Sequence, residues 1–356
     1  MANVNVSVRP SEAIKSAWTL FGTSFSKPVT IEEAINEAGL GYSVDAQPLL
    51  RVPKEVIDAI MRGENVDFSP TKENIISSHK STFRTDNNTT LGVVGRDYGV
   101  VQNTKAFEFI NFIKEVSGEE PLIETAGSLG YGERMFITCR LGEDCYLNGN
   151  SDAVKNYVVF TNSHDGSSAV MAFFTPVRVI CQNTLNVAIR GAANKVIFKH
   201  TKNVNHRLDW EIEENRKKAL EVFSKSVQFS TKFIENMQML KAEKLTKEEI
   251  RDITHKMYLT PSQFDLFSKN NYSVEGIEEI STRTKNQILL FQDALDFGIG
   301  QENYRGTKLW MLNGMTTMLQ NDNEKKWKKQ EDKFESIMGG DIAKKTQKMY
   351  DLLIAA

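Results

Sequence analysis

The sequence has few cysteines and no long hydrophobic run, and each of these features argues against one class of protein. Its three cysteines, Cys139, Cys145 and Cys181, have no C-x-x-C spacing, so we expect neither a disulfide framework nor a zinc knuckle. The longest apolar runs, such as Tyr157–Phe160 and Val170–Phe174, are far shorter than the roughly 18 residues that span a bilayer. The N-terminus also lacks the basic-then-apolar pattern of a secretion signal. We therefore expect no membrane partner and a cytoplasmic location.

Neither sign of charge is in excess, and the common catalytic signatures are missing. The chain has 44 Lys and Arg and 46 Asp and Glu, a net charge of −2, so any nucleic-acid binding has to come from a local patch. The five histidines lack the spacing of a structural metal site. No phosphate-binding loop G-x-x-x-x-G-K-[ST], no G-x-S-x-G and no H-E-x-x-H occurs. We expect no metal and no cofactor.

The glycine-rich stretch from Gly127 to Gly132 is the nearest approach to a nucleotide-binding loop. Its glycines are Gly127, Gly130 and Gly132, and the segment that follows them has the pattern of a strand. A dinucleotide-binding loop is followed by a helix. The pattern therefore favours a flexible turn between two strands.

The N-terminal part of the chain has clear helix and strand signals. Thr30 and Glu33 form a capping box that predicts a helix closed by Gly39, and residues 42–53 alternate in the manner of a strand. Residues 82–85 and 91–95, on either side of Asp86-Asn87-Asn88, predict a β-hairpin. Asn103 and Thr104 can cap the helix that follows.

Four further strands and a series of helices complete the expected fold. Strands are predicted at 123–126, 135–141, 157–160 and 169–174, and the short connections between them favour an antiparallel sheet. A helix is expected from Pro176 or Cys181 to Arg190, and one long helix or two in line over Trp210–Lys241. Helices are expected over 246–356, the first of them after a cap at Thr246 to Glu249. We therefore predict an α+β fold, a curved antiparallel β-sheet core with helices packed on one face, followed by a helical C-terminal region. The expected divisions are an entry region at 1–70, the sheet core at 71–208 and the helical region at 209–356.

Basic and aromatic residues on the predicted sheet indicate one candidate function. Residues 195–207 contain four basic residues, two histidines and no acid. A concave sheet with arginines, lysines and aromatic rings can hold a phosphate backbone and stack on bases, although such residues are also common on an ordinary solvated face. The candidate phosphate contacts are Arg96, Arg134, Arg178, Lys195 and Lys199, and the candidate stacking residues are Tyr98 and Tyr131.

The turn at Ser163–Ser167 carries the alternative, an enzyme. His164 and Asp165 could serve a hydrolase or a nuclease, because His is a common acid and base in catalysis. Adjacent side chains in one turn do not easily face each other, however, and Asp commonly bonds its own backbone in turns. The sequence alone leaves both interpretations open.

Several segments together resemble a known family. LGVVGRDYGVVQNTKAFEFI, ETAGSLGYGERMFITCRL, FTNSHDGSSAVMAFFTPVRVICQNTLNVAI and RGTKLWMLNGMTTMLQ with SIMGGDIAKK look like the phage/plasmid-like protein family, a domain of unknown function encoded on mobile elements. The resemblance covers about residues 80 to 350. It implies a mobile-element protein acting in a bacterial host cell, and it transfers no catalytic residue.

A weaker similarity concerns the order of elements. A hairpin, a helix and a curved antiparallel sheet are similar to the core of single-strand annealing proteins, which bind single-stranded DNA as rings or filaments; this is an analogy of architecture. We therefore expect a homo-oligomer that binds single-stranded DNA for protection, annealing or recombination without covalent catalysis. The alternatives are the enzyme centred on His164 and Asp165, acting against host defence, and a structural homo-oligomer that sequesters a host factor.

Overall fold

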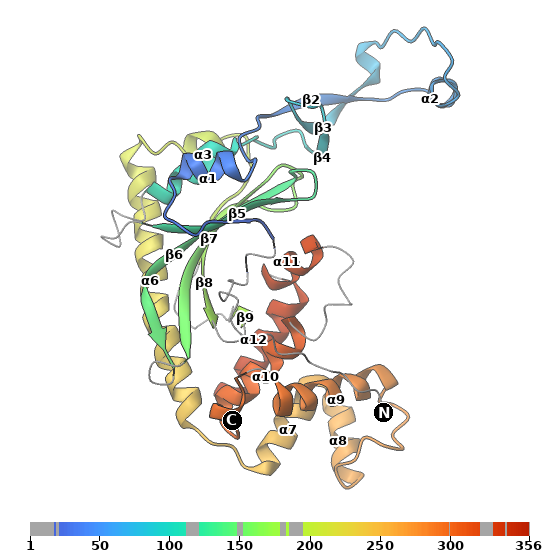
Figure 1. Ribbon diagram of the computed structural model, residues 1–356. Helices are drawn as coiled ribbons and strands as arrows, with labels where there is room; N and C mark the ends of the chain where they lie inside the picture. Colours follow the sequence, from blue (N-terminus) through green and yellow to red (C-terminus); the bar gives the residue numbers. More distant parts are fainter. Residues whose placement is uncertain are drawn as a thin grey trace.

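The computed structural model describes residue 18 and residues 21–111, 121–147, 152–178, 183–184, 195–298, 300–320, 330–338 and 340–355. These residues form two antiparallel sheets followed by a helical C-terminal region (Figure 1). The expected α+β class is confirmed.

The main sheet contains seven strands among the described residues. Its order is β1-β5-β6-β7-β8-β10, with β9 also paired to β8, and every pairing is antiparallel. Because β5 to β8 are neighbours in both sequence and space, this part is a meander with short connections, as the sequence predicts. The strands are β1 (Thr23–Ser24), β5 (Leu122–Leu129), β6 (Arg134–Tyr146), β7 (Ala153–Ser163), β8 (Val170–Arg178), β9 (Asn183–Thr184) and β10 (Lys195–Phe198).

Helical residues contact both faces of this sheet, whereas we expected them on one. Ile137 and Phe160 are paired on neighbouring strands and so share a face, and Phe136 points to the other face because side chains alternate along a strand. Phe160 contacts Phe109 with ring centroids 5.8 Å apart, and Phe136 contacts Phe334 at 5.1 Å. Burial on both faces explains why β7 is an almost continuous run of buried residues.

A second sheet of three strands, in the order β2-β3-β4, contains the predicted hairpin. Its strands are β2 (Val44–Leu50), β3 (Ile75–Arg84) and β4 (Thr90–Gly95). Asn88 in the β3–β4 turn has φ +60°, a conformation that Asn tolerates better than most residues. The sequence signals for this hairpin and for β2 are thus confirmed.

Long-range hydrogen bonds join the small sheet to the main one. The hydroxyl of Tyr42 donates to the carbonyl of Gly132 over 2.8 Å, and that of Thr82 donates to the carbonyl of His164 over 2.6 Å. A Cβ added to Gly92 of β4 would lie 2.6 Å from the Cα of Asp165. A glycine at position 92 therefore permits β4 to lie against the turn after β7.

Most of the expected helices are present. Thr30 and Thr246 form capping boxes with Glu33 and Glu249, as predicted, and the long helix expected from Trp210 is a single helix of 30 residues. The helices before residue 200 are α1 (Ile31–Glu37), α2 (Lys54–Met61), η1 (Lys72–Asn74), α3 (Asn103–Phe107) and η2 (Glu108–Ile110). Those after it are α5 (Val204–Arg207), α6 (Glu213–Ala242), α7 (Lys247–Tyr258), α8 (Pro261–Lys269), α9 (Thr282–Phe297), η3 (Glu302–Tyr304), α10 (Lys308–Gln320), α11 (Gln330–Met338) and α12 (Asp341–Ala355).

Two expected helix starts differ from the structure. Pro176 lies in β8, paired with Asn156, because β8 continues to Arg178; the alternative start at Cys181 lies outside the described residues. The N-cap of α3 is Gln102, and Asn103 is its first residue. The Nδ2 group of Asn103 donates instead to the carbonyl of Leu40 over 2.8 Å, so tertiary contacts use the side chain that the sequence had suggested as a cap.

One hydrophobic core runs through all three expected divisions of the chain. It includes Ile35 from the entry region, Phe160 from the sheet and Met315 from α10. A smaller cluster of Leu259, Phe267, Ile277, Ile280 and Ile288 lies among α7, α8 and α9. No helix within the described ranges is long and apolar enough to cross a membrane.

Candidate functional site

A groove lies where the small sheet meets the segment after β10. It has a volume of about 590 Å³. Its walls come from β3, from the turn after β4 and from the loop before α5. The lining residues are Ser77, Ser78, Gly95, Arg96, Asp97, Tyr98, His200 and Thr201. The groove thus joins residues that are about a hundred positions apart in the sequence.

Tyr98 and His200 hold the two walls of this groove together. Their rings stack with centroids 4.6 Å apart. The hydroxyl of Tyr98 donates to the carbonyl of Ser163 over 2.7 Å, and Nδ1–H of His200 donates to the carbonyl of Gly99 over 2.9 Å. Burial lowers the pKa of His200 and raises that of Tyr98. Both rings are therefore neutral wall residues near pH 7.

The exposed charge at the groove is mainly positive. The side chain of Arg96 is 72% exposed, and its Nε lies 3.6 Å from a carboxylate oxygen of Asp97. Lys199 and Lys202, both exposed, flank the lining residues His200 and Thr201. Exposed ion pairs such as that of Arg96 contribute little, so its guanidinium can exchange Asp97 for an anionic ligand.

Arg207 orders the segment that carries these lysines. One of its terminal nitrogens donates to the carbonyl of Lys199 and to the hydroxyl of Thr201, each over 2.7 Å. This fixes the backbone on which Lys199 and Thr201 are placed. Arg207 therefore supports the wall of the groove, while the side chains of Lys199 and Lys202 stay exposed to solvent.

Two of the seven predicted nucleic-acid contacts, Arg96 and Tyr98, line the groove, and a third, Lys199, is exposed next to the lining residue His200. Tyr98, which we expected to stack on a base, stacks on His200. Lys195 is exposed at the start of β10, opposite Phe173 on β8. Arg178 ends β8, paired with Val154 and Asn183, and its side chain lies outside what the structure describes.

Arg134 and Tyr131 occupy other surroundings. Arg134 forms ion pairs with Asp165, at 3.5 Å, and with Glu335 of α11. Two carboxylates thus neutralise its charge. Tyr131 is 75% exposed in the β5–β6 turn, where its carbonyl accepts a hydrogen bond from Arg84.

His164 lies inside the protein, where it links the two sheets. It has no exposed surface, and its Nε2–H donates to the Oδ1 of Asn103 over 3.0 Å. Burial lowers its pKa to about 3, so the ring is neutral near pH 7. Asp165 accepts hydrogen bonds from the backbone N–H and the hydroxyl of Ser167. This geometry is that of a turn bonded to its own backbone, and it favours the structural interpretation of the pair.

The remaining groove residues carry little signal in the sequence. Ser77 and Ser78 lie on β3 outside any motif, and only the pairing of β3 with β4 brings them beside Arg96. His200 and Thr201 belong to the basic window at 195–207, which was the one usable signal. Their placement depends on contacts between distant segments, which local patterns do not encode.

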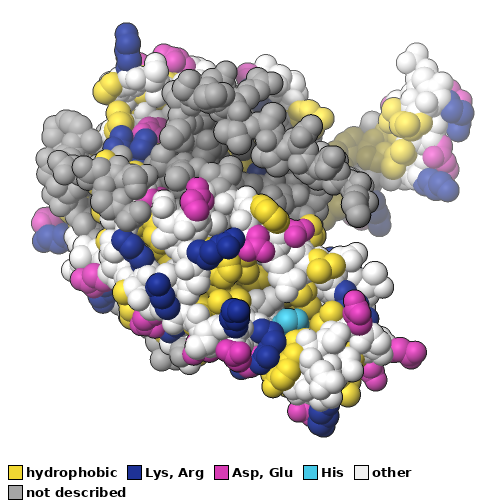
Figure 2. All heavy atoms as spheres, turned by 60° about the horizontal axis from the view of Figure 1, so that its bottom comes forward, with side chains coloured by type: hydrophobic (Ala, Val, Ile, Leu, Met, Phe, Trp, Pro, Cys, Tyr) yellow, Lys and Arg dark blue, Asp and Glu magenta, His cyan; other side chains and the backbone are white. Residues whose placement is uncertain are grey.

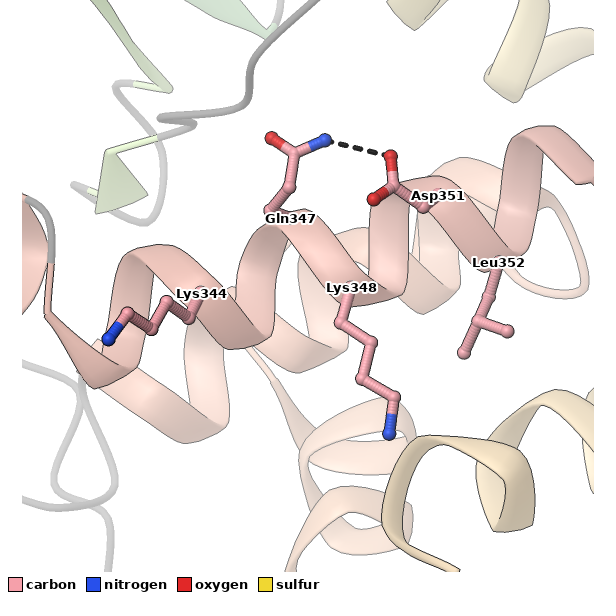
Figure 3. A pocket seen from close by; sticks show the side chains of 5 residues that line it. All are labelled: Lys344, Gln347, Lys348, Asp351 and Leu352. Atoms are coloured by element: carbon pink, nitrogen blue, oxygen red, sulfur yellow. Dashed lines mark hydrogen bonds between the residues drawn. The ribbon is translucent and has the colours of Figure 1, made fainter. Parts of the chain in front are cut away.

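A second cavity of about 420 Å³ lies along α12 (Figure 3). Three of the polar side chains that line it are engaged, because Nζ of Lys348 donates to the carbonyl of Met257 over 2.6 Å and Gln347 donates to Asp351 over 2.8 Å. The fourth, Lys344, is exposed. Burial lowers the pKa of Lys348. The groove at Arg96 is therefore the better candidate for an anionic ligand.

The face formed by the C-terminal helices shows no expanse of a single charge. In Figure 2 its Lys and Arg side chains lie among Asp, Glu and hydrophobic side chains. Among the described residues, no group of three or more His, Cys, Asp and Glu side chains could hold a metal ion.

Comparison with known proteins places the chain in a family. No curated protein and no solved structure matches it. A family model described as a domain of unknown function matches residues 90–343, which include Arg96, Tyr98, His200 and Thr201 but not Ser77 and Ser78. Because this match covers well over half of the sequence, the chain belongs to the DUF932 family of domains of unknown function.

Proposed function

We propose that the protein binds single-stranded DNA, with the groove at Arg96 as a contact for the phosphate backbone. The observation that carries the proposal is the meeting of Arg96 with the 199–202 segment across a groove. Guanidinium and ammonium groups neutralise phosphates, and hydroxyls such as those of Ser77, Ser78 and Thr201 are common further donors to phosphate oxygens.

The size of the groove favours a single strand over a duplex. Its volume of about 590 Å³ lies within the range of about 300–1,000 Å³ that is typical of small-molecule pockets. Such a space suits the phosphate and sugar of one strand. Tyr98, held by His200 and Ser163, serves this site as a wall.

The wider role follows from the kind of binding. A site that contacts phosphates carries no sequence information, so the protein binds strands of any sequence, as proteins that protect or anneal single strands do. We propose a mobile element as its setting, in line with the resemblance to phage and plasmid proteins, which itself implies no activity. Neither the protection nor the annealing of single strands requires covalent chemistry.

Binding to a fluorescent thymidine oligonucleotide, measured by anisotropy at several salt concentrations, tests the proposal. We expect Arg96→Glu and Lys199→Glu each to weaken binding by about tenfold or more. For single-stranded DNA, each phosphate contact that is removed should make the plot of log affinity against log salt concentration less steep by about 0.7. A duplex of equal length should bind more weakly than the single strand.

Arg283→Glu is the matched control, because Arg283 is exposed on α9, outside the groove. It should leave the affinity and the salt slope unchanged. Thermal melting of each variant verifies that the fold is intact. Unchanged salt-dependent affinity in a folded Arg96→Glu/Lys199→Glu double variant would refute the proposal.

A further inference from the structure

His200 is the only histidine among the side chains that line the groove at Arg96. Histidine is the side chain whose ordinary pKa lies between about pH 5 and pH 8, so small changes around this ring can alter its charge. The rest of the lining consists of glycine, serine, threonine and tyrosine residues and of the ion pair between Arg96 and Asp97. Among the lining residues, His200 is therefore the one that can respond to pH near neutrality.

The neutral ring of His200 has its proton on Nδ1. This nitrogen donates to the carbonyl of Gly99 over 2.9 Å, so Nε2 carries the free lone pair. Nε2 is itself buried and has no hydrogen-bond partner among the described residues, and the residue is only 9% exposed. A buried polar nitrogen without a partner is uncommon in folded proteins. A second proton can bind there while the bond to Gly99 is kept.

The groups around the ring oppose one another in their effect on its charge. Burial lowers the pKa of His200, while the carbonyl of Gly99 and the carboxylate of Asp165 act in the opposite direction. Asp165 also forms an ion pair with Arg134 at 3.5 Å. Tyr98, which stacks on the ring, is neutral because burial raises its pKa. Burial therefore prevails in the free protein, and the ring is neutral near pH 7.

The other charged neighbours are positive. Arg96, Lys199 and Lys202 are exposed at the groove, and Arg207 bonds the backbone beside the ring through the carbonyl of Lys199. Such cations disfavour a further positive charge as long as no anion is bound.

His164, at the end of β7, does not compete for the proton. Burial, and to a smaller extent the charge of His200, lowers the pKa of His164 to about 3. The ring of His164 therefore stays neutral over the range in which His200 can titrate.

We propose that the groove binds a phosphate of the DNA strand together with a proton, which Nε2 of His200 takes up from the solvent. Uptake of the proton presupposes the proposed function, binding of single-stranded DNA, because it needs a phosphate in the groove. Each phosphodiester carries one negative charge, and an opposite charge beside an imidazole favours its charged form. Bound DNA therefore raises the pKa of His200, and by reciprocity the charged ring raises the affinity for DNA by the same factor.

The affinity should rise as the pH falls. At about pH 8 the ring is neutral with and without DNA, because this pH lies well above the ordinary pKa of histidine, about 6.5. At lower pH the DNA-bound protein holds a proton that the free protein, whose pKa at His200 is lowered by burial, still lacks. Each unit by which DNA raises the pKa of His200 gives up to about tenfold in affinity. Ordinary lysines, arginines and carboxylates keep their charge between about pH 5.5 and pH 8, as do phosphodiesters and thymine bases.

Anisotropy titrations of a thymidine oligonucleotide from about pH 8 to about pH 5.5, at constant ionic strength and with a dye that does not titrate in this range, test the proposal. We expect the dissociation constant of the wild type to fall by about tenfold. That of His200→Gln should change little with pH. His79→Gln and His206→Gln are the matched controls, because both histidines are exposed and outside the lining of the groove. Each should keep the pH dependence of the wild type.

Nuclear magnetic resonance of the wild type with isotope-labelled histidine measures the proton directly. The ring signal of His200, identified by its contact with Tyr98, should titrate about one pH unit higher in the presence of the oligonucleotide. This measurement needs no variant, so it decides the question if circular dichroism shows that His200→Gln is misfolded.

The outcomes separate the proton uptake from DNA binding itself. No binding of the oligonucleotide at any pH would refute the proposed function and the proton uptake together. Binding with the same affinity at every pH, a pH dependence that folded His200→Gln retains, or an unshifted His200 signal would each overturn the proton uptake alone.

Discussion

At the scale of single residues, His164 changes from a candidate catalyst to a link between sheets. Its ring has no exposed surface and bonds Asn103, and its carbonyl accepts from Thr82 of the small sheet. The pattern of polar residues around it therefore reflects a buried hydrogen-bond network. Such networks specify a unique packing when their members are satisfied.

The low pKa of His164 predicts how stability depends on pH. The unfolded chain binds a proton near pH 6.5, whereas the folded chain binds it only near pH 3, because burial disfavours the charged ring. Between these values the unfolded state holds more protons, so His164 lowers the free energy of unfolding as pH falls, by about 1.4 kcal/mol per pH unit. His200 and His255, whose pKa values burial also lowers, act in the same direction.

Urea titrations between pH 7 and about pH 4 measure this dependence. His164→Gln keeps a donor for Asn103 and cannot titrate in this range. We therefore expect the free energy of unfolding of this variant to fall less steeply with decreasing pH than that of the wild type, by the equivalent of about one bound proton. His79→Gln alters an exposed histidine and should keep the slope of the wild type. Equal slopes for all three proteins would contradict the assignment.

At the scale of elements, the docking of the small sheet depends on Gly92. Because a Cβ at this position would lie 2.6 Å from the Cα of Asp165, Gly92→Ala forces β4 and the 163–167 turn apart. We expect a loss of about 1–3 kcal/mol, as for other overpacked positions. Gly95→Ala is the control within the same strand, since a Cβ there meets no atom within 4 Å.

Chemical denaturation of the two glycine variants checks this prediction. Gly92→Ala should shift the midpoint clearly to lower denaturant, and Gly95→Ala should shift it by much less. Equal shifts would mean that the loss comes from replacing a strand glycine in general, and that the close approach to Asp165 is unimportant.

Sequence patterns predict the elements whose signals are local. The capping boxes at Thr30 and Thr246, the hairpin at Asp86-Asn87-Asn88 and the four meander strands were all found in this way. The helix start predicted at Pro176 was wrong. Proline often marks the start of a helix, but here it lies in β8. The groove could be predicted only in part: Arg96 has a visible charge, while Ser77 and Ser78 lie beside it only through the pairing of β3 with β4.

At the scale of the whole molecule, a buried hydrogen bond ties the sheet to the C-terminal helices. The hydroxyl of Tyr304 in η3 donates to a carboxylate oxygen of Asp152, next to β7, over 2.5 Å, and both residues are buried. A hydrogen bond to a charged group contributes about 1.5–3 kcal/mol. We expect Tyr304→Phe to lower stability by a similar amount.

Calorimetry tests whether the two regions unfold together. Because one core includes residues of both, wild type and Tyr304→Phe should each show one main transition, at a lower temperature for the variant. Tyr272→Phe, at a half-exposed tyrosine of the loop after α8, should leave the transition almost unchanged. Two separate transitions in the wild type would show that the shared core does not make the regions cooperative.

The groove itself exists only when distant parts of the chain have come together. Ser78 and Arg96 belong to the small sheet and its turn, and His200 and Thr201 follow the last strand of the main sheet. A ligand that bridges these walls binds the docked chain and not the undocked one. By mass action it shifts the equilibrium toward docking, so slowed hydrogen exchange at the β3–β4 amides would report occupancy of the groove without any label on the ligand.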